Sequence, residues 1–146
     1  HIHATGGGKE GEEKLRRRLF EKGISGYEKL TDIRPYINNM GIVMKAADVV
    51  MCRAGASTLA EIALTGTASI LVPSPYVTNN HQQANAEAFA DAGAAKMMLE
   101  SRCSGSGLYR AALEILNNEE MCKRAASLGV SDSARKITDI ILSYVK

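Results

Sequence analysis

The segment RAGAST, residues 53–58, has residue types that could bind an anion. Gly55 lets the chain turn sharply and lets a ligand approach the backbone, which a Cβ would obstruct. If a helix begins here, the amides of Ala56, Ser57 and Thr58 point outward without partners, and the helix dipole favours negative charge at that end. The two hydroxyls are additional donors. The segment therefore predicts a phosphate or diphosphate site.

Glu61 lies one turn into the same expected helix and has two interpretations. The spacing Thr58-x-x-Glu61 fits a capping box, in which the carboxylate only satisfies a backbone amide at the helix start. Alternatively, the carboxylate accepts two hydrogen bonds from a ribose diol, as acidic residues do at nucleotide sites. Arg53, at the end of the preceding strand, could support the site with charge or pack beside it. The pattern by itself leaves both interpretations of Glu61 open.

A second polar segment, NNHQQAN at residues 79–85, is expected to begin another helix. Asn79 or Asn80 could cap this helix, which places Gln82 and Gln83 in its first turn beside the preceding loop. A carboxamide offers a donor and an acceptor together, which suits sugar hydroxyls better than a charged side chain does. The alternative is a polar first turn that faces only solvent.

The glycine run GGGKEG, residues 6–11, is a weaker candidate for phosphate binding. A Walker A loop needs Ser or Thr after its lysine to hold magnesium, whereas Lys9 is followed by Glu10. This segment is therefore not a P-loop. A glycine run before a helix is more often a turn than a phosphate site.

His1 and His3 flank an apolar residue at the start of the chain. They could be metal ligands or remnants of a tag, but the pattern offers no third ligand. The simpler interpretation is that they are residues of a short strand.

The composition excludes several classes of protein. A formal charge of +2, a pI near 8.5 and the lack of a basic block interleaved with aromatics argue against nucleic-acid binding. Three cysteines without a CxxC spacing indicate neither a disulfide framework nor a zinc site, and they fit a reducing cytosol. No apolar stretch approaches the roughly 18 residues that a membrane span needs.

Alternating strands and helices are expected to position these loops. Continuous apolar runs at 49–52 and 69–72 predict strands buried on both faces, as in a parallel sheet covered by helices. Further strands are expected at 1–5, 27–30 and 96–99, with 33–37 extended, and helices at 9–22, from 38 or 39 to 47, and at 58–64, 80–92, 107–116, 119–128 and 133–145. The order predicts a doubly wound α/β domain with a helical tail. Ligands of such sheets bind beyond the carboxyl ends of the strands.

The elements R-x-G-A-x-T-x-x-E at 53–61 and H-Q-Q-x-N-A at 81–86, taken together, resemble the carboxyl-terminal, donor-binding domain of MurG-type glycosyltransferases. These enzymes add N-acetylglucosamine to lipid-linked muramyl-pentapeptide in peptidoglycan synthesis. The resemblance spans nearly the whole chain, from the HATG strand to the final helices, and is densest between Ala47 and Met98. It implies the Rossmann-like C-terminal half of a GT-B glycosyltransferase.

The resemblance also implies a role for each matching position. The backbone of Ile37 should meet the uracil, Ala56, Ser57 and Thr58 the diphosphate, Glu61 the ribose, and Gln82 and Gln83 the sugar hydroxyls, with Asn85 and Arg53 as supports. The family usually has an arginine where this chain has His81, so a contact from that side chain is not carried over. No Asp-x-Asp motif occurs in the sequence, and we expect neither a cofactor nor a divalent metal.

The resemblance implies that residues 1–146 are a donor-binding domain truncated at its start, because the family's first strand and its G-G-S-type loop precede the matched region. The amino-terminal acceptor domain, with the catalytic base and the membrane-facing surface, is then absent. The parent protein would be an inverting transferase, peripheral on the cytoplasmic side of the bacterial plasma membrane. The fragment itself is expected to be soluble, to contain no catalytic residue and to bind UDP-N-acetylglucosamine weakly without turnover.

Two rival functions are considered. One is a stand-alone donor-binding subunit that works with a separate membrane-bound partner. The other is a nucleotide-sugar protein of the same architecture with different chemistry, such as an epimerase.

Overall fold

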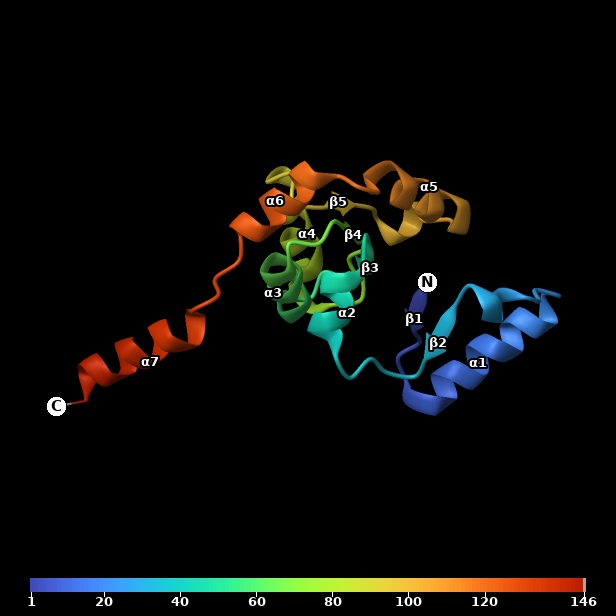
Figure 1. Ribbon diagram of the computed structural model, residues 1–146, viewed down its shortest axis with the longest axis horizontal. Coiled ribbons are helices and arrows are strands. Elements are labelled where there is room, and N and C mark those ends of the chain that lie inside the picture. Colours follow the sequence, from blue (N-terminus) through green and yellow to red (C-terminus); the bar gives the residue numbers. More distant parts are fainter. Residues whose placement is uncertain (146) are drawn as a thin grey trace. The chain divides into compact units, whose positions relative to one another are not determined.

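The computed structural model describes residues 1–145 and divides the chain into two compact units, His1–Met40 and the remainder from Gly41 onwards (Figure 1). Each unit combines helices with parallel strands. The predicted α/β class is therefore confirmed. The described strands form two sheets, one of two strands in the order β1-β2 and one of three in the order β3-β4-β5.

The first unit is a strand–helix–strand arrangement. Strand β1 (Ile2–Ala4) is followed by α1 (Gly8–Glu21), the 3₁₀ helix η1 (Tyr27–Lys29) and β2 (Asp32–Arg34). The two strands pair in parallel, with His3 opposite Ile33. The predicted strand at 27–30 is wrong. Gly26 has a φ of 77°, and the amides of Leu30 and Thr31 both donate to the carbonyl of Tyr27, which closes a helical turn instead.

The second unit contains the three-stranded sheet and most of the helices. Its elements in chain order are α2 (Met40–Ala46, which begins at the boundary), β3 (Val50–Cys52), α3 (Ala56–Thr65), β4 (Ser69–Leu71), η2 (Thr78–Asn80), α4 (His81–Asp91), β5 (Lys96–Met97), η3 (Glu100–Arg102), α5 (Gly105–Ile115), α6 (Glu119–Ser127) and α7 (Ser133–Tyr144). Strand β4 lies between β3 and β5 and pairs in parallel with both. Helices α5, α6 and α7 form the predicted helical tail.

The core of this unit lies around β4, because the central strand is covered on both faces. All three residues of β4 are buried, as the continuous apolar run predicted. A cluster around Ile70 joins the strand to α5 and α6 through Ala111, Ile115 and Met121. Helix α3, which contacts α6, also contributes its buried residues, which are Leu59, Ile62 and Ala63. A rigid sheet thus supports the loops that leave its carboxyl edge.

The described helices include none that is both long and apolar enough to cross a bilayer.

Candidate functional site

The loop between β3 and α3 delivers a bare helix N-terminus to the carboxyl edge of the sheet. Gly55 is the N-cap residue and has extended backbone angles, φ −71° and ψ 144°. The first helical hydrogen bond runs from the amide of Leu59 to the carbonyl of Gly55, at 3.0 Å. Across residues 1–145, no acceptor contacts the amides of Ala56, Ser57 or Thr58, and no hydrogen bond uses the two hydroxyls. These donors can therefore receive an anion without breaking an existing bond.

The structure contradicts the capping interpretation of Glu61. Helix α3 begins at Ala56, two residues before the predicted start, so Thr58 is its third residue and not its N-cap. No side chain caps this helix, and in the described part of the chain the Glu61 carboxylate makes no hydrogen bond or ion pair. The helix starts early because alanine and serine continue it, while Gly55 supplies the extended residue. Glu61 is consequently available to a ligand.

The negative charge of Glu61 acts on the neighbouring thiol of Cys52. Cys52 is the last residue of β3 and is partly buried. Burial raises the pKa of this thiol from 9.0 to about 11, and the Glu61 carboxylate contributes to the increase. The thiol is therefore protonated at neutral pH, and Glu61 is the only charged group that acts on it in the described chain.

The sharp-turn role expected of Gly55 is wrong. Its φ of −71° is open to any residue, and an added Cβ would meet only the Thr58 hydroxyl oxygen, at 3.9 Å. The protein itself therefore does not require glycine here. Access of a ligand to the backbone is the remaining reason for glycine, and it stays a prediction.

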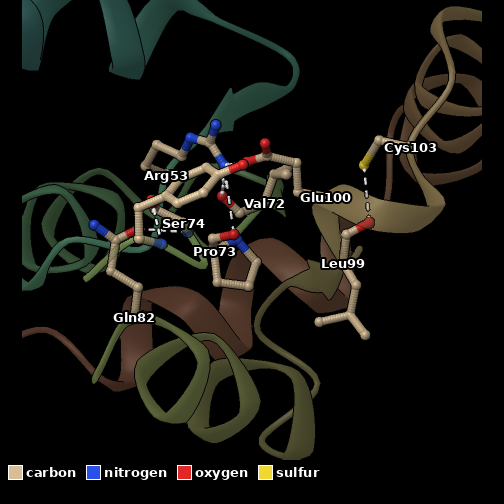
Figure 2. Close-up of polar contacts among 9 residues, drawn as sticks. Arg53, Val72, Pro73, Ser74, Gln82, Leu99, Glu100 and Cys103 are labelled. Atoms are coloured by element: carbon tan, nitrogen blue, oxygen red, sulfur yellow. Dashed lines mark hydrogen bonds and ion pairs between the residues drawn. The ribbon is translucent and has the colours of Figure 1, made fainter. Parts of the chain in front are cut away.

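Arg53 is directed toward the neighbouring strands of the sheet (Figure 2). Its Nη1 donates to the carbonyls of Val72 at 3.2 Å and Pro73 at 3.4 Å, and to the Glu100 carboxylate at 2.5 Å. Val72 and Pro73 follow β4, and Glu100 follows β5. One guanidinium group thus joins the carboxyl ends of all three strands of this sheet.

The loop between β4 and α4 is held by the amide side chains for which the sequence predicts contacts with sugar hydroxyls. Gln82 accepts a hydrogen bond from the Ser74 amide at 2.9 Å (Figure 2), and its own NH₂ group makes no bond within residues 1–145. Gln83 accepts from Asn80 at 2.9 Å and donates to Glu87 at 2.8 Å. Both glutamines therefore hold the loop, and Gln82 keeps free donors.

The start of α4 differs from the expected cap. Asn79 and Asn80 both adopt left-handed backbone angles with φ 53°, and Asn80 occupies the N-cap position without a side-chain cap. The His81 ring lies 2.8 Å from the carbonyl of Thr78, an exposed contact. Asn85 donates to the carbonyl of Ala54 at 3.1 Å, which ties α4 to the loop before α3.

A pocket of about 200 Å³ lies between the β4–α4 loop and η3. Its walls expose more apolar than polar surface and comprise Pro73, Ser74, Pro75, Asn80, Gln83, Leu99, Glu100 and Ser101. Of these residues, the sequence motifs predict a role only for Gln83 and, as a possible cap, for Asn80. The signal that could have found Glu100 is its place, because it comes just after a strand, where ligands of parallel sheets bind.

Ile37 belongs to the first unit. Its side chain is buried, with 6% of its surface exposed, and it follows β2 after the Pro35–Tyr36 bend. No acceptor contacts its amide in the described residues. His1 and His3 lie edge to face with ring centroids 5.7 Å apart, and residues 1–145 contain no group of three potential metal ligands.

The comparisons with known proteins decide the family. Residues 1–140 match the glycosyltransferase family 28 C-terminal domain. The chain belongs to this family. The resemblance carried by the motifs at 53–61 and 81–86 is thereby confirmed.

The relatives and the solved structures agree with this assignment. The chain is 45% identical, over 88% of its length and 40% of the relative, to the UDP-N-acetylglucosamine--N-acetylmuramyl-(pentapeptide) pyrophosphoryl-undecaprenol N-acetylglucosamine transferase 1 of Bacillus cereus. It is 40% identical to the transferase of the same description from Trichlorobacter lovleyi, over 99% of its own length and 37% of the relative. The crystal structure of Acinetobacter baumannii MurG superposes with a TM-score of 0.76 at 27% identity, covering 97% of this chain and 40% of that one. The family 28 chain therefore spans about 40% of the length of these relatives.

Proposed function

We propose that this chain is the donor-binding part of an enzyme that transfers N-acetylglucosamine from UDP-N-acetylglucosamine to undecaprenyl-diphospho-N-acetylmuramoyl-pentapeptide. The names of the 45% and 40% identical relatives support the reaction and both substrates. The observation that carries the proposal is the start of α3, where three amides, two hydroxyls and the nearby Glu61 carboxylate have no partner among residues 1–145.

The proposed chemistry follows from where charge develops. As the sugar leaves, negative charge grows on the diphosphate, and fixed amide donors at a helix N-terminus stabilise that charge without reorganising. The donors of Ala56, Ser57 and Thr58 fit this task, so the step needs no divalent metal. A base from another domain would deprotonate the acceptor hydroxyl, which then attacks the anomeric carbon with inversion.

The remaining contacts are proposed from the positions that match the family motif. They are supported by hydrogen-bonding groups that have no partner in the described residues. Glu61 accepts hydrogen bonds from the ribose diol, since its carboxylate has no other partner in the described chain. Gln82 and Gln83 bind the sugar hydroxyls, and Gln83 lines the pocket beside their loop. The Ile37 amide is proposed to meet the uracil. Asn85 and Arg53 act as supports, because both of them already bind the carbonyls of neighbouring loops.

The location and the catalytic competence of the chain are also proposals. We propose that residues 1–146 are a donor domain whose parent protein carries an acceptor domain and lies peripherally at the cytoplasmic face of the plasma membrane. The 146-residue chain would then bind the donor without transferring its sugar. The coverage of 37–40% of the relatives supports this division.

Calorimetric titration of the chain with UDP-N-acetylglucosamine tests the proposal. Glu61→Ala removes an acceptor of two charge-assisted hydrogen bonds and should weaken binding by roughly tenfold to a hundredfold. The matched control is Glu114→Ala on α5, which removes an exposed carboxylate that pairs with Lys96 instead. Equal affinity of the Glu61 variant and the wild type would remove Glu61 from the site. Sugar transfer by the chain alone would contradict the division of labour.

A further inference from the structure

Glu100 is connected to the proposed donor site by a chain of polar contacts that the sequence gave no reason to expect. It is the first residue of η3, which follows β5 after Met98 and Leu99. Its carboxylate accepts from Arg53 at 2.5 Å, and the same nitrogen reaches the carbonyls of Val72 and Pro73 (Figure 2). Glu100 thus supplies the one charged acceptor in this contact. The two carbonyls are neutral and more distant.

The contact ends on the loop that leads to the glutamines. Pro73 is followed by Ser74, whose amide donates to Gln82. The position of Pro73 therefore sets where the Ser74 amide points, and with it the orientation of the Gln82 side chain. No hydrogen bond joins Glu100 to Gln82 in the described residues, and the hydrogen-bonded route between them runs through Arg53 and this loop.

Residues of this contact and of its loop also line the pocket beside them. Pro73, Ser74 and Glu100 all line the cavity of about 200 Å³, together with Gln83 and Asn80. The α3 N-terminus, by contrast, contributes no residue to it. The wall on the β4–β5 side is largely apolar, but its Asn80, Gln83 and Glu100 side chains can bind hydroxyl groups. It is separate from the unpaired amides at the start of α3, which suit phosphate.

We propose that Glu100 is a positioning residue, which through Arg53 fixes the Pro73–Pro75 loop and so the wall that recognises the sugar half of the nucleotide sugar. This inference rests on the proposed function. It assigns Arg53 to the sugar side, because every polar contact of its guanidinium in the described chain is with residues after β4 and β5. Loss of the Glu100 charge leaves Arg53 only two long, neutral contacts, so the loop loses its charge-assisted support from the β5 side and depends on the Ser74–Gln82 bond.

The test compares two ligands on the same variants of the 146-residue chain. Glu100→Ala should raise the Kd for UDP-N-acetylglucosamine about threefold to tenfold, the range of a partly exposed ion pair, and leave the Kd for UDP unchanged. Glu100→Gln, which keeps an acceptor oxygen without the charge, should have a smaller effect in the same direction. The control Glu114→Ala removes the ion pair of the β5 residue Lys96 and should change neither Kd.

A double-mutant cycle identifies the route of the effect. Arg53→Met alone and Arg53→Met with Glu100→Ala should show the same loss for the nucleotide sugar, because each breaks the same contact. Additive losses would overturn the inference, as would an Arg53→Met variant that weakens UDP and UDP-N-acetylglucosamine equally, since Arg53 would then act on the phosphates.

The outcomes separate this inference from the proposed function. A wild-type chain that binds neither ligand contradicts the proposed function and the inference together. A wild-type chain that binds both, with a ratio of the two Kd values that Glu100→Ala and Glu100→Gln leave unchanged, overturns the positioning role alone. Thermal melting of each variant, compared with the wild type, confirms that the comparison is between folded proteins.

Discussion

The turns that connect β1 to α1 and β3 to α3 both contain glycine before a helix, but they use it differently. In the first, Gly6, Gly7 and Gly8 all have φ between 63° and 64°, in the left-handed region that other residues avoid. In the second, Gly55 has an ordinary extended backbone. Three glycines therefore build a turn, whereas one glycine leaves space above three free amides. The number of glycines in a loop does not indicate whether the loop binds phosphate.

The largest effect on the glycine turn before α1 is expected when a side chain is added at Gly11. A Cβ there would lie 2.0 Å from the carbonyl oxygen of Gly6 and 3.2 Å from the Thr5 hydroxyl oxygen, so the turn before α1 must move. We expect Gly11→Ala to destabilise the first unit by about 3 kcal/mol. Hydrogen exchange of the α1 amides measures this loss. Unchanged protection would show that the turn yields easily.

High pH should lower the stability of the second unit through Cys52, which is one of three free cysteines in that unit. Because folding raises the pKa of Cys52 from 9.0 to about 11, the folded state holds its proton where the unfolded chain has released it. The stabilising contribution is complete below pH 9 and is lost as the pH rises toward 11, by about 2 kcal/mol.

Urea denaturation between pH 8 and 11, with wild type and Cys52→Ala side by side, measures this effect. The wild type should lose more stability over the interval than the variant does. Parallel pH profiles would contradict the assigned pKa. Alkylation of Cys52 should likewise accelerate only near pH 11, and Glu61→Gln should move that rise to lower pH.

Gly55→Ala sharpens the comparison, because it separates folding from binding. The new methyl group makes only an ordinary contact at 3.9 Å, so the stability should change by less than about 0.5 kcal/mol. If the diphosphate approaches this backbone, affinity for UDP should fall roughly tenfold. Calorimetry with UDP gives the affinity, and urea denaturation gives the stability. A variant that binds UDP like the wild type would contradict the proposed approach of the ligand.

Gly7→Ala is the counterpart in the first turn and should have a modest effect on stability and none on binding. A Cβ at Gly7 meets nothing closer than 3.7 Å, so the cost is that of the left-handed backbone alone, about 1 kcal/mol. Hydrogen exchange of α1 should show this modest loss, and UDP affinity should be unchanged. If Gly7→Ala destabilised α1 more than Gly11→Ala does, the close contact at Gly11 would not be the main constraint on this turn.

Most elements could be predicted because their signals are local. The apolar runs at 49–52 and 69–72 correspond to β3 and β4, and Gly66, with φ 65°, ends α3 where the sequence indicated. The error at 27–30 arose where Tyr27 and Leu30 suggested a strand while Gly26 favoured a turn. The early start of α3 was missed because Thr58-x-x-Glu61 imitates a capping box.

The sequence by itself determined the family and the alternation of strands and helices, and it predicted the donors at residues 56–58. These depend on short patterns, in which a residue type and its spacing are sufficient. Only the tertiary structure showed that α3 begins at Ala56, so that Glu61 does not take part in a capping box. It also showed that Arg53 binds Glu100, which lies 47 residues further along the chain. Such contacts depend on which strand ends lie side by side, and pairing between strands is set by the packing of the whole sheet.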